Sequence, residues 1–182
     1  MMTNKEKCIH NLQQARTSHI RWLNSIKLLI SGVEMDEQSM KPLPTESRFG
    51  QWFYDEAMHF SQPICQMSLE EIDTLLSAIY DEYTKIYLIY FGEGKGGFKS
   101  MFGLKHKVNR HEAELSGRYY EEVLKYSDQL KKKLRVFESQ LMSLSDDKFD
   151  ALAAFSMPEA MPVAEIEKEN SDDGYLYGGR VR

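Results

Sequence analysis

The longest run of helical periodicity lies between residues 109 and 144, and it limits the fold more than any other feature. Its inward positions recur at alternating spacings of three and four, as in a helix that packs one face against its neighbours. These positions are Ser116, Tyr120, Val123, Ser127, Leu130, Leu134, Phe137, Leu141 and Leu144. Asn109 and Glu112 have the spacing of a capping box. Such a helix is about 50 Å long, so we expect other long helices to cover it.

Two other segments show the same spacing and are expected to pack against this helix. The first covers residues 3–32, and its inward positions are Ile9, Leu12, Arg16, His19, Leu23, Ile26 and Ile30. The second begins at a capping-box pattern formed by Ser68 and Glu71 and ends near Phe91. Its inward positions are Ile72, Leu76, Ile79, Tyr83, Ile86 and Tyr90. Shorter helices are expected over about 48–60 and 146–155.

These elements predict an all-α protein, an up-down four-helix bundle with a short second helix, a long fourth helix and a disordered C-terminal tail. We divide the chain into a three-helix portion over 1–92 and a Gly-rich basic loop over 93–108. The long fourth helix and a short helix over 109–155 complete the bundle. Residues 156–182 are rich in acidic residues, Pro and Gly, and are expected to be the disordered tail.

Composition excludes several classes of protein. The chain has 182 residues and a net charge of −5, which argues against binding to nucleic acid. It has no apolar run of about 18 residues and no secretory signal pattern at its N-terminus. Its two cysteines, Cys8 and Cys65, are too few for a disulfide framework. We therefore expect a cytoplasmic protein, with Cys8 as an exposed helix thiol and Cys65 in a loop.

The sequence holds no pattern of catalytic residues, so we do not expect an enzyme. Gly92 and Gly97 have the spacing of a phosphate-binding loop, but Phe98 stands where that motif requires Lys. Neither cysteine stands in a sequence pattern that marks a reactive thiolate, such as a CxxC pair. Of the five histidines, His19 is the one expected to be buried, because it lies on the inward face of the first helix among apolar residues. A buried imidazole needs a partner for its ring nitrogens.

Two segments are candidates for binding a partner. The Gly-rich loop places apolar side chains among lysines and could dock an acidic protein, whereas a membrane surface is not expected. Near the end of the tail, two tyrosines are flanked by glycines. The third helix carries a stripe of tyrosines, Tyr80, Tyr83, Tyr87 and Tyr90, for which packing in the core is the favoured interpretation. The candidate partner-binding residues are Phe98, Lys99, Met101, Phe102, Tyr87, Tyr175 and Tyr177.

Two motifs resemble those of the bacterial chemoreceptor zinc-binding (CZB) domains. His19 and Trp22 match the HxxW pattern of that family's first helix. The stretch from Thr45 to Tyr54, with Phe49, Gly50 and Trp52, is similar to its CxFGxWLY segment. The resemblance covers roughly residues 7–90 and implies a four-helix bundle. Without the family, Trp22, Phe49, Gly50 and Trp52 are interpreted as packing residues.

The resemblance also implies a zinc site of three histidines and one cysteine, which this sequence does not preserve. His19 matches the first ligand, but Ser47 stands in the place of the cysteine. The remaining pair falls on Ile79 and Tyr83 in the nearest register, and neighbouring registers offer no better ligands. We therefore expect a degenerate site without a cofactor, in which His19 hydrogen-bonds to Tyr83 or Ser47. A rearranged zinc site using His19, with His59 and Asp81 or Glu82, is the alternative.

The resemblance implies a regulatory role, since family members control a fused signalling output. This sequence carries no cyclase or receptor signature, so we expect a stand-alone signalling module that acts by binding another protein. A diguanylate cyclase or a chemotaxis component is the kind of partner implied. Homodimerisation is also expected, because the stretch from Leu130 to Leu144 extends beyond the reach of the other helices and must pack on a partner or on the short helix after it.

Overall fold

The computed structural model describes residues 3–92 and 108–156, and all regular structure in these ranges is helical. This confirms the predicted all-α class. The five α-helices are α1 (Asn4–Ile30), α2 (Arg48–Asp55), α3 (Gln66–Tyr90), α4 (Arg110–Ser143) and α5 (Asp146–Ser156). Three short 3-10 turns, η1 (Glu37–Ser39), η2 (Pro44–Glu46) and η3 (Ala57–Phe60), lie in the connections.

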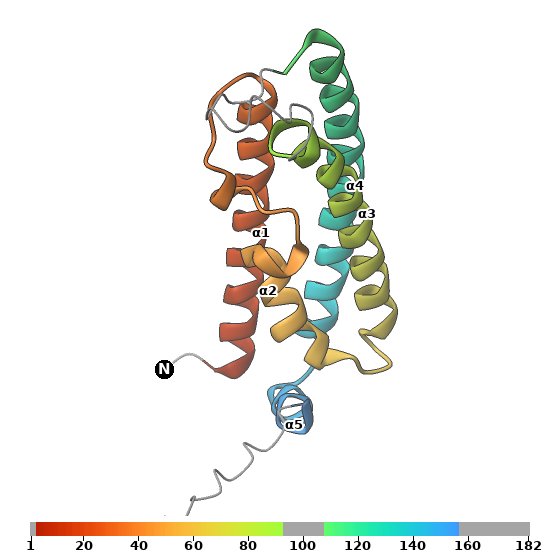
Figure 1. Cartoon of the computed structure of the whole chain (residues 1–182). Helices are drawn as coiled ribbons and strands as arrows, with labels where there is room; N and C mark the ends of the chain where they lie inside the picture. The colour runs from red at the N-terminus through yellow and green to blue at the C-terminus, as the bar shows by residue number, and fades with distance from the viewer. Residues whose placement is uncertain (1–2, 93–107, 157–182) are drawn as a thin grey trace, which may run out of the picture.

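The long helices α1, α3 and α4 lie side by side, and the short helix α2 packs on α1 (Figure 1). Helices α1 and α4 run in opposite directions: the Tyr120 hydroxyl donates to the carbonyl of Leu23 at 3.2 Å, and Lys5 donates to the carbonyl of Met142 at 3.0 Å. Helix α5 crosses the end of the molecule at which α1 begins (Figure 1). There the ring of Phe149 lies 5.0 Å from that of Phe60.

The predicted start is right for one long helix and wrong for another. Asn109 and Glu112 form the predicted capping box at the start of α4, with hydrogen bonds of 2.9 and 3.0 Å. The predicted start of the third helix at Ser68 is wrong: α3 begins at Gln66, and Ser68 is buried within it. The turn before α3 causes this early start, because the carbonyl of Gln62 accepts from the amides of both Cys65 and Gln66 at 2.8 Å.

The second helix is shorter than predicted. It starts after Ser47, whose hydroxyl accepts from the amide of Gly50 at 2.9 Å. It ends at Asp55, because Glu56 leaves helical geometry with φ of −126° and ψ of −56°. The chain then forms the turn η3 rather than continuing the helix to Phe60.

The inward face of α4 is covered within one chain. Eight of its nine predicted positions are buried, and Leu144 is half-buried. Leu130, Leu134, Phe137 and Leu141 are at most 1% exposed. The argument for a homodimer from this face therefore loses its basis, although pairing itself stays a prediction.

Some predictions concern finer features than these. The up-down four-helix arrangement stays a prediction. The Gly-rich loop, except Val108, and the tail, except Ser156, lie outside the described residues.

Within the described ranges, none of the helices has the length and apolar character needed to cross a membrane.

Candidate functional site

The position of His19 on α1 is the centre of the first candidate site. Its side chain is only 4% exposed, and its Nε2 lies 3.1 Å from the hydroxyl of Ser127 on α4. The expectation that His19 hydrogen-bonds to Tyr83 or Ser47 is therefore wrong. Sequence reasoning placed both His19 and Ser127 on inward helix faces but could not show that these two faces meet at this level.

Burial determines the charge of this histidine. Loss of solvent lowers the pKa of His19 to about 4, and the nearby cation of Lys131 acts in the same direction. The imidazole is therefore neutral at physiological pH. A neutral ring that shares one hydrogen bond with a hydroxyl satisfies the core without introducing a buried charge.

Aromatic rings surround His19, and we call His19, Trp22, Phe49, Tyr80 and Tyr83 the aromatic cluster. The ring centroid of His19 lies 5.6 Å from that of Trp22 and 5.3 Å from that of Phe49. The Trp22 ring stacks on Tyr80 at 4.9 Å and meets Tyr83 edge-on at 4.8 Å. Such ring pairs are stabilised beyond their burial by complementary face and edge charges. The cluster joins α1, α2 and α3.

The polar atoms of the positions that replace the family's zinc ligands are engaged within the protein. The Ser47 hydroxyl accepts from the amide of Gly50 and donates to the carbonyl of Pro44 at 2.7 Å. The fully buried Tyr83 donates its hydroxyl to the carbonyl of Met40, and burial raises the pKa of Tyr83 well above its usual range. Ile79 is completely buried and has no donor atom.

This set of side chains does not fit a zinc ion. Zinc sites use imidazole, thiolate or carboxylate groups, and of the four positions only His19 supplies one. The rearranged set has no better geometry: within 3–92 and 108–156, no three His, Cys, Asp or Glu residues are grouped so that they could hold a metal ion. His59 and Asp81 are exposed, and Glu82 forms an ion pair with Lys85 at 2.5 Å.

Both cysteines are buried, which corrects the expectation of an exposed thiol at Cys8. Cys8 lies one helical turn before Leu12 on the inward side of α1. Burial is the main cause that raises the pKa of Cys8 to about 12, and the neighbouring carboxylate of Glu56 adds to it. Burial also raises the pKa of Cys65, the residue before α3. Both thiols therefore stay protonated and poorly nucleophilic.

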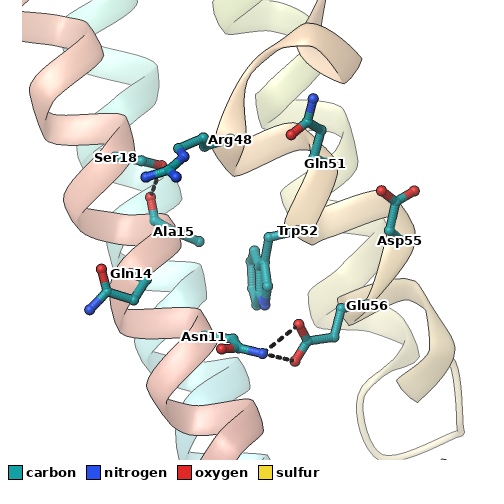
Figure 2. A pocket seen from close by; sticks show the side chains of 9 residues that line it. All are labelled: Asn11, Gln14, Ala15, Ser18, Arg48, Gln51, Trp52, Asp55 and Glu56. Carbon is teal, nitrogen blue, oxygen red and sulfur yellow. Dashed lines mark hydrogen bonds between the residues drawn. The ribbon is translucent and has the colours of Figure 1, made fainter.

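A second candidate site is a groove of about 440 Å³ between α1 and α2 (Figure 2). Its lining residues are Asn11, Gln14, Ala15, Ser18, Arg48, Gln51, Trp52, Asp55 and Glu56. At one end the Asn11 amide donates to both carboxylate oxygens of Glu56, at 3.2 and 2.9 Å. Burial raises the pKa of Glu56, while its hydrogen bond with Asn11 acts in the opposite direction.

Sequence reasoning missed this groove, although α2 carried a signal for it. Phe49 and Phe53 are buried, whereas Arg48, Gln51 and Asp55 are exposed. This alternation of a buried and a polar face over two turns was visible in the sequence. What the sequence could not show is that Arg48 lies beside Ser18 of α1, at one end of a groove between the two helices.

The structure places the motif residues and one of the seven partner candidates, Tyr87. Phe49, Gly50 and Trp52 are buried, and Trp22 is half-buried against the core, as their packing role predicts. Tyr87 is half-buried and donates to Glu37 at 2.8 Å. The other partner candidates, Phe98, Lys99, Met101, Phe102, Tyr175 and Tyr177, lie outside the described residues.

Comparisons with known proteins return no relative. No family model, no curated protein and no solved structure matches this chain.

Proposed function

We propose that this chain is a regulatory signalling module that acts by binding another protein. In this proposal its fold is an up-down four-helix bundle similar to the CZB domains, with the family's zinc site replaced by the aromatic cluster. The module would work in the cytoplasm without a resident metal, on a partner such as a diguanylate cyclase or a chemotaxis component.

The aromatic cluster is the observation that carries this proposal. His19 is hydrogen-bonded to Ser127, and the hydroxyl of Tyr83 is bonded to the carbonyl of Met40. The first contact joins α1 to α4, and the second joins α3 to the segment before α2. A bundle held in this way keeps a defined surface for recognition, which is what a binding module requires.

The two buried thiols are consistent with a binding role. Cys8 and Cys65 are buried with raised pKa values, so neither presents a reactive thiolate. Catalysis by an activated thiol would need the opposite environment, with a cation or a helix N-terminus nearby.

Co-purification of the tagged full chain from its native host tests the proposal. We expect one signalling protein to be retained repeatedly and to be absent when an unrelated helical protein of similar size is the bait. Failure to retain any stable partner under several growth conditions would contradict the proposed function.

Homodimerisation is a separate part of this proposal, because CZB domains pair through their bundles. Sedimentation of the purified chain at micromolar concentration tests it. A dimer is expected, and a monomer at that concentration would remove this part while leaving binding to another protein open.

A further inference from the structure

The groove between α1 and α2 contains a hydrogen-bond donor without a partner. Trp52 is only 8% exposed, and its indole Nε1 is buried with no acceptor. The side chains of Arg16 and Gln140 also have a buried polar atom without a partner, but neither residue lines the groove. A buried N–H without an acceptor is unfavourable, so this position favours a ligand that supplies one.

The direction of the indole shows where such an acceptor would lie. Figure 2 shows the ring of Trp52 edge-on between the two helices, with its nitrogen on the side of Asn11 and Glu56. These two side chains are hydrogen-bonded to each other at the protein surface. Because Nε1 is itself shielded from solvent, we expect a ligand that bonds to it to separate Asn11 from Glu56, which is half-buried.

Charge is distributed unevenly along the groove. The cation of Arg48 lies at one end, beside Ser18, and the carboxylate of Glu56 lies at the other, next to Asn11 (Figure 2). A ligand with one acidic and one basic group matches this distribution. A phosphate matches it poorly, since Arg48 is the one cation among the lining residues and two carboxylates lie nearby.

Length and side-chain chemistry narrow the class of ligand. The eight residues of α2 span about 12 Å at 1.5 Å per residue, which is close to the length of three or four residues of extended chain. The volume of about 440 Å³ lies in the range of ligand sites. Three amide side chains, of Asn11, Gln14 and Gln51, line it. Amides can donate to and accept from a peptide backbone at the same time.

We infer that the α1–α2 groove binds a short extended peptide segment that carries one acidic and one basic side chain. A backbone carbonyl of the peptide accepts from Nε1 of Trp52, its acidic group pairs with Arg48, and its basic group faces Glu56. This inference rests on the proposed function and deepens it, because it names one surface by which the module recognises a protein.

The two tryptophans make a direct test available. Trp22 and Trp52 are the only two in the chain, so an ¹⁵N-labelled sample gives two indole N–H signals, and Trp52→Phe identifies one of them. The probes are four acetylated and amidated tripeptides: Asp-Ala-Lys, Lys-Ala-Asp, Asp-Ala-Asp and Lys-Ala-Lys. The first two cover both backbone directions of a mixed-charge peptide.

We expect a mixed-charge peptide to move the Trp52 signal downfield in a saturable way, while the signal of Trp22 stays in place. Its binding should be at least about threefold tighter than that of either single-charge peptide, as partly exposed ion pairs allow. In Arg48→Glu the preference should change to Lys-Ala-Lys. Lys132→Glu makes the same change of charge at an exposed position outside the groove and should leave the preference unchanged.

Either of two results would overturn the inference. One is a Trp52 signal that no peptide moves at millimolar concentration, which means that only water reaches the indole. The other is an equal shift with all four peptides that Arg48→Glu does not alter. Both results concern this groove alone, so they are distinguishable from failure of the proposed function, which co-purification tests on the whole surface.

Discussion

The aromatic cluster and the α1–α2 groove share one short helix but differ in how their polar atoms are satisfied. In the cluster, His19 and Tyr83 are buried, and each has a hydrogen-bond partner in the protein. In the groove, the indole nitrogen of Trp52 has none, and Arg48 is exposed. Phe49 and Trp52, whose rings lie 5.6 Å apart, connect the two regions. The comparison indicates that the closed region maintains the fold, and in our proposal the open region serves recognition.

The largest expected difference between the two regions is in stability. Phe49→Ala removes a ring that is 2% exposed and should lower the free energy of unfolding by about 3–5 kcal/mol. Gln51→Ala, two residues away on the exposed side of the same helix, should change it by less than about 0.5 kcal/mol. Urea unfolding of both variants measures this. Similar losses in the two would show that the groove is part of the packed core.

Acid should destabilise the closed region through His19. Its pKa is lowered from 6.5 to about 4 by burial, so between these values the unfolded chain binds more protons than the folded one. Stability is therefore lost as pH falls from 6.5 toward 4, by about 3 kcal/mol in total. His19→Gln should reduce this slope in urea unfolding at stepped pH, whereas His10→Gln, at an exposed position, should not. An unchanged slope in His19→Gln would contradict a neutral buried imidazole.

A methyl group at position 50 tests how tightly α2 is held. A Cβ on Gly50 would lie 2.0 Å from the carbonyl oxygen of Pro44, a backbone atom. Gly50→Ala should therefore lower the free energy of unfolding by about 1–3 kcal/mol. Gly117→Ala is the matched control, because nothing lies within 4 Å of its added Cβ, and alanine should stabilise α4 by about 0.5–1 kcal/mol. Thermal melting compares them, and an unaffected Gly50→Ala would mean that the turn before α2 yields easily.

Loss of one hydroxyl should have a smaller but measurable effect. Tyr83→Phe keeps the ring but leaves the carbonyl of Met40 without its donor, which should destabilise the chain by about 1–2 kcal/mol. Tyr87→Phe removes a hydroxyl that bonds to Glu37 in an exposed contact and should have less effect. Equal shifts in melting temperature for the two variants would show that the connection at Met40 does not help to hold the segment before α2.

The regular elements could be predicted from local rules, because each rule depends on residues close in sequence. The spacing of inward positions on α4 and the Asn109–Glu112 capping box needed no tertiary information. The predicted start of α3 at Ser68 was wrong, because the turn that contains Pro63 starts the helix earlier through the carbonyl of Gln62. The prediction that Cys8 is exposed was wrong for a similar reason, because the residues that cover that end of α1 come from distant parts of the chain.

The candidate sites could be predicted only in part, because they depend on contacts between elements far apart in sequence. The inward position of His19 was predictable, but its partner Ser127 lies 108 residues away. The polar side of α2 was visible in the pattern of Arg48, Gln51 and Asp55. The unpartnered nitrogen of Trp52 could not be foreseen, since it depends on how the indole is oriented between α1 and α2.

Zinc content of the purified chain, together with its melting temperature with and without added zinc, tests the central claim most directly. The account predicts that elemental analysis finds no stoichiometric zinc and that zinc leaves the melting temperature unchanged, because the aromatic cluster holds the bundle and His19 is bonded to Ser127. Stoichiometric zinc, with a rise in melting temperature that His19→Ala abolishes, would contradict it. The protein would then be a metal sensor with rearranged ligands.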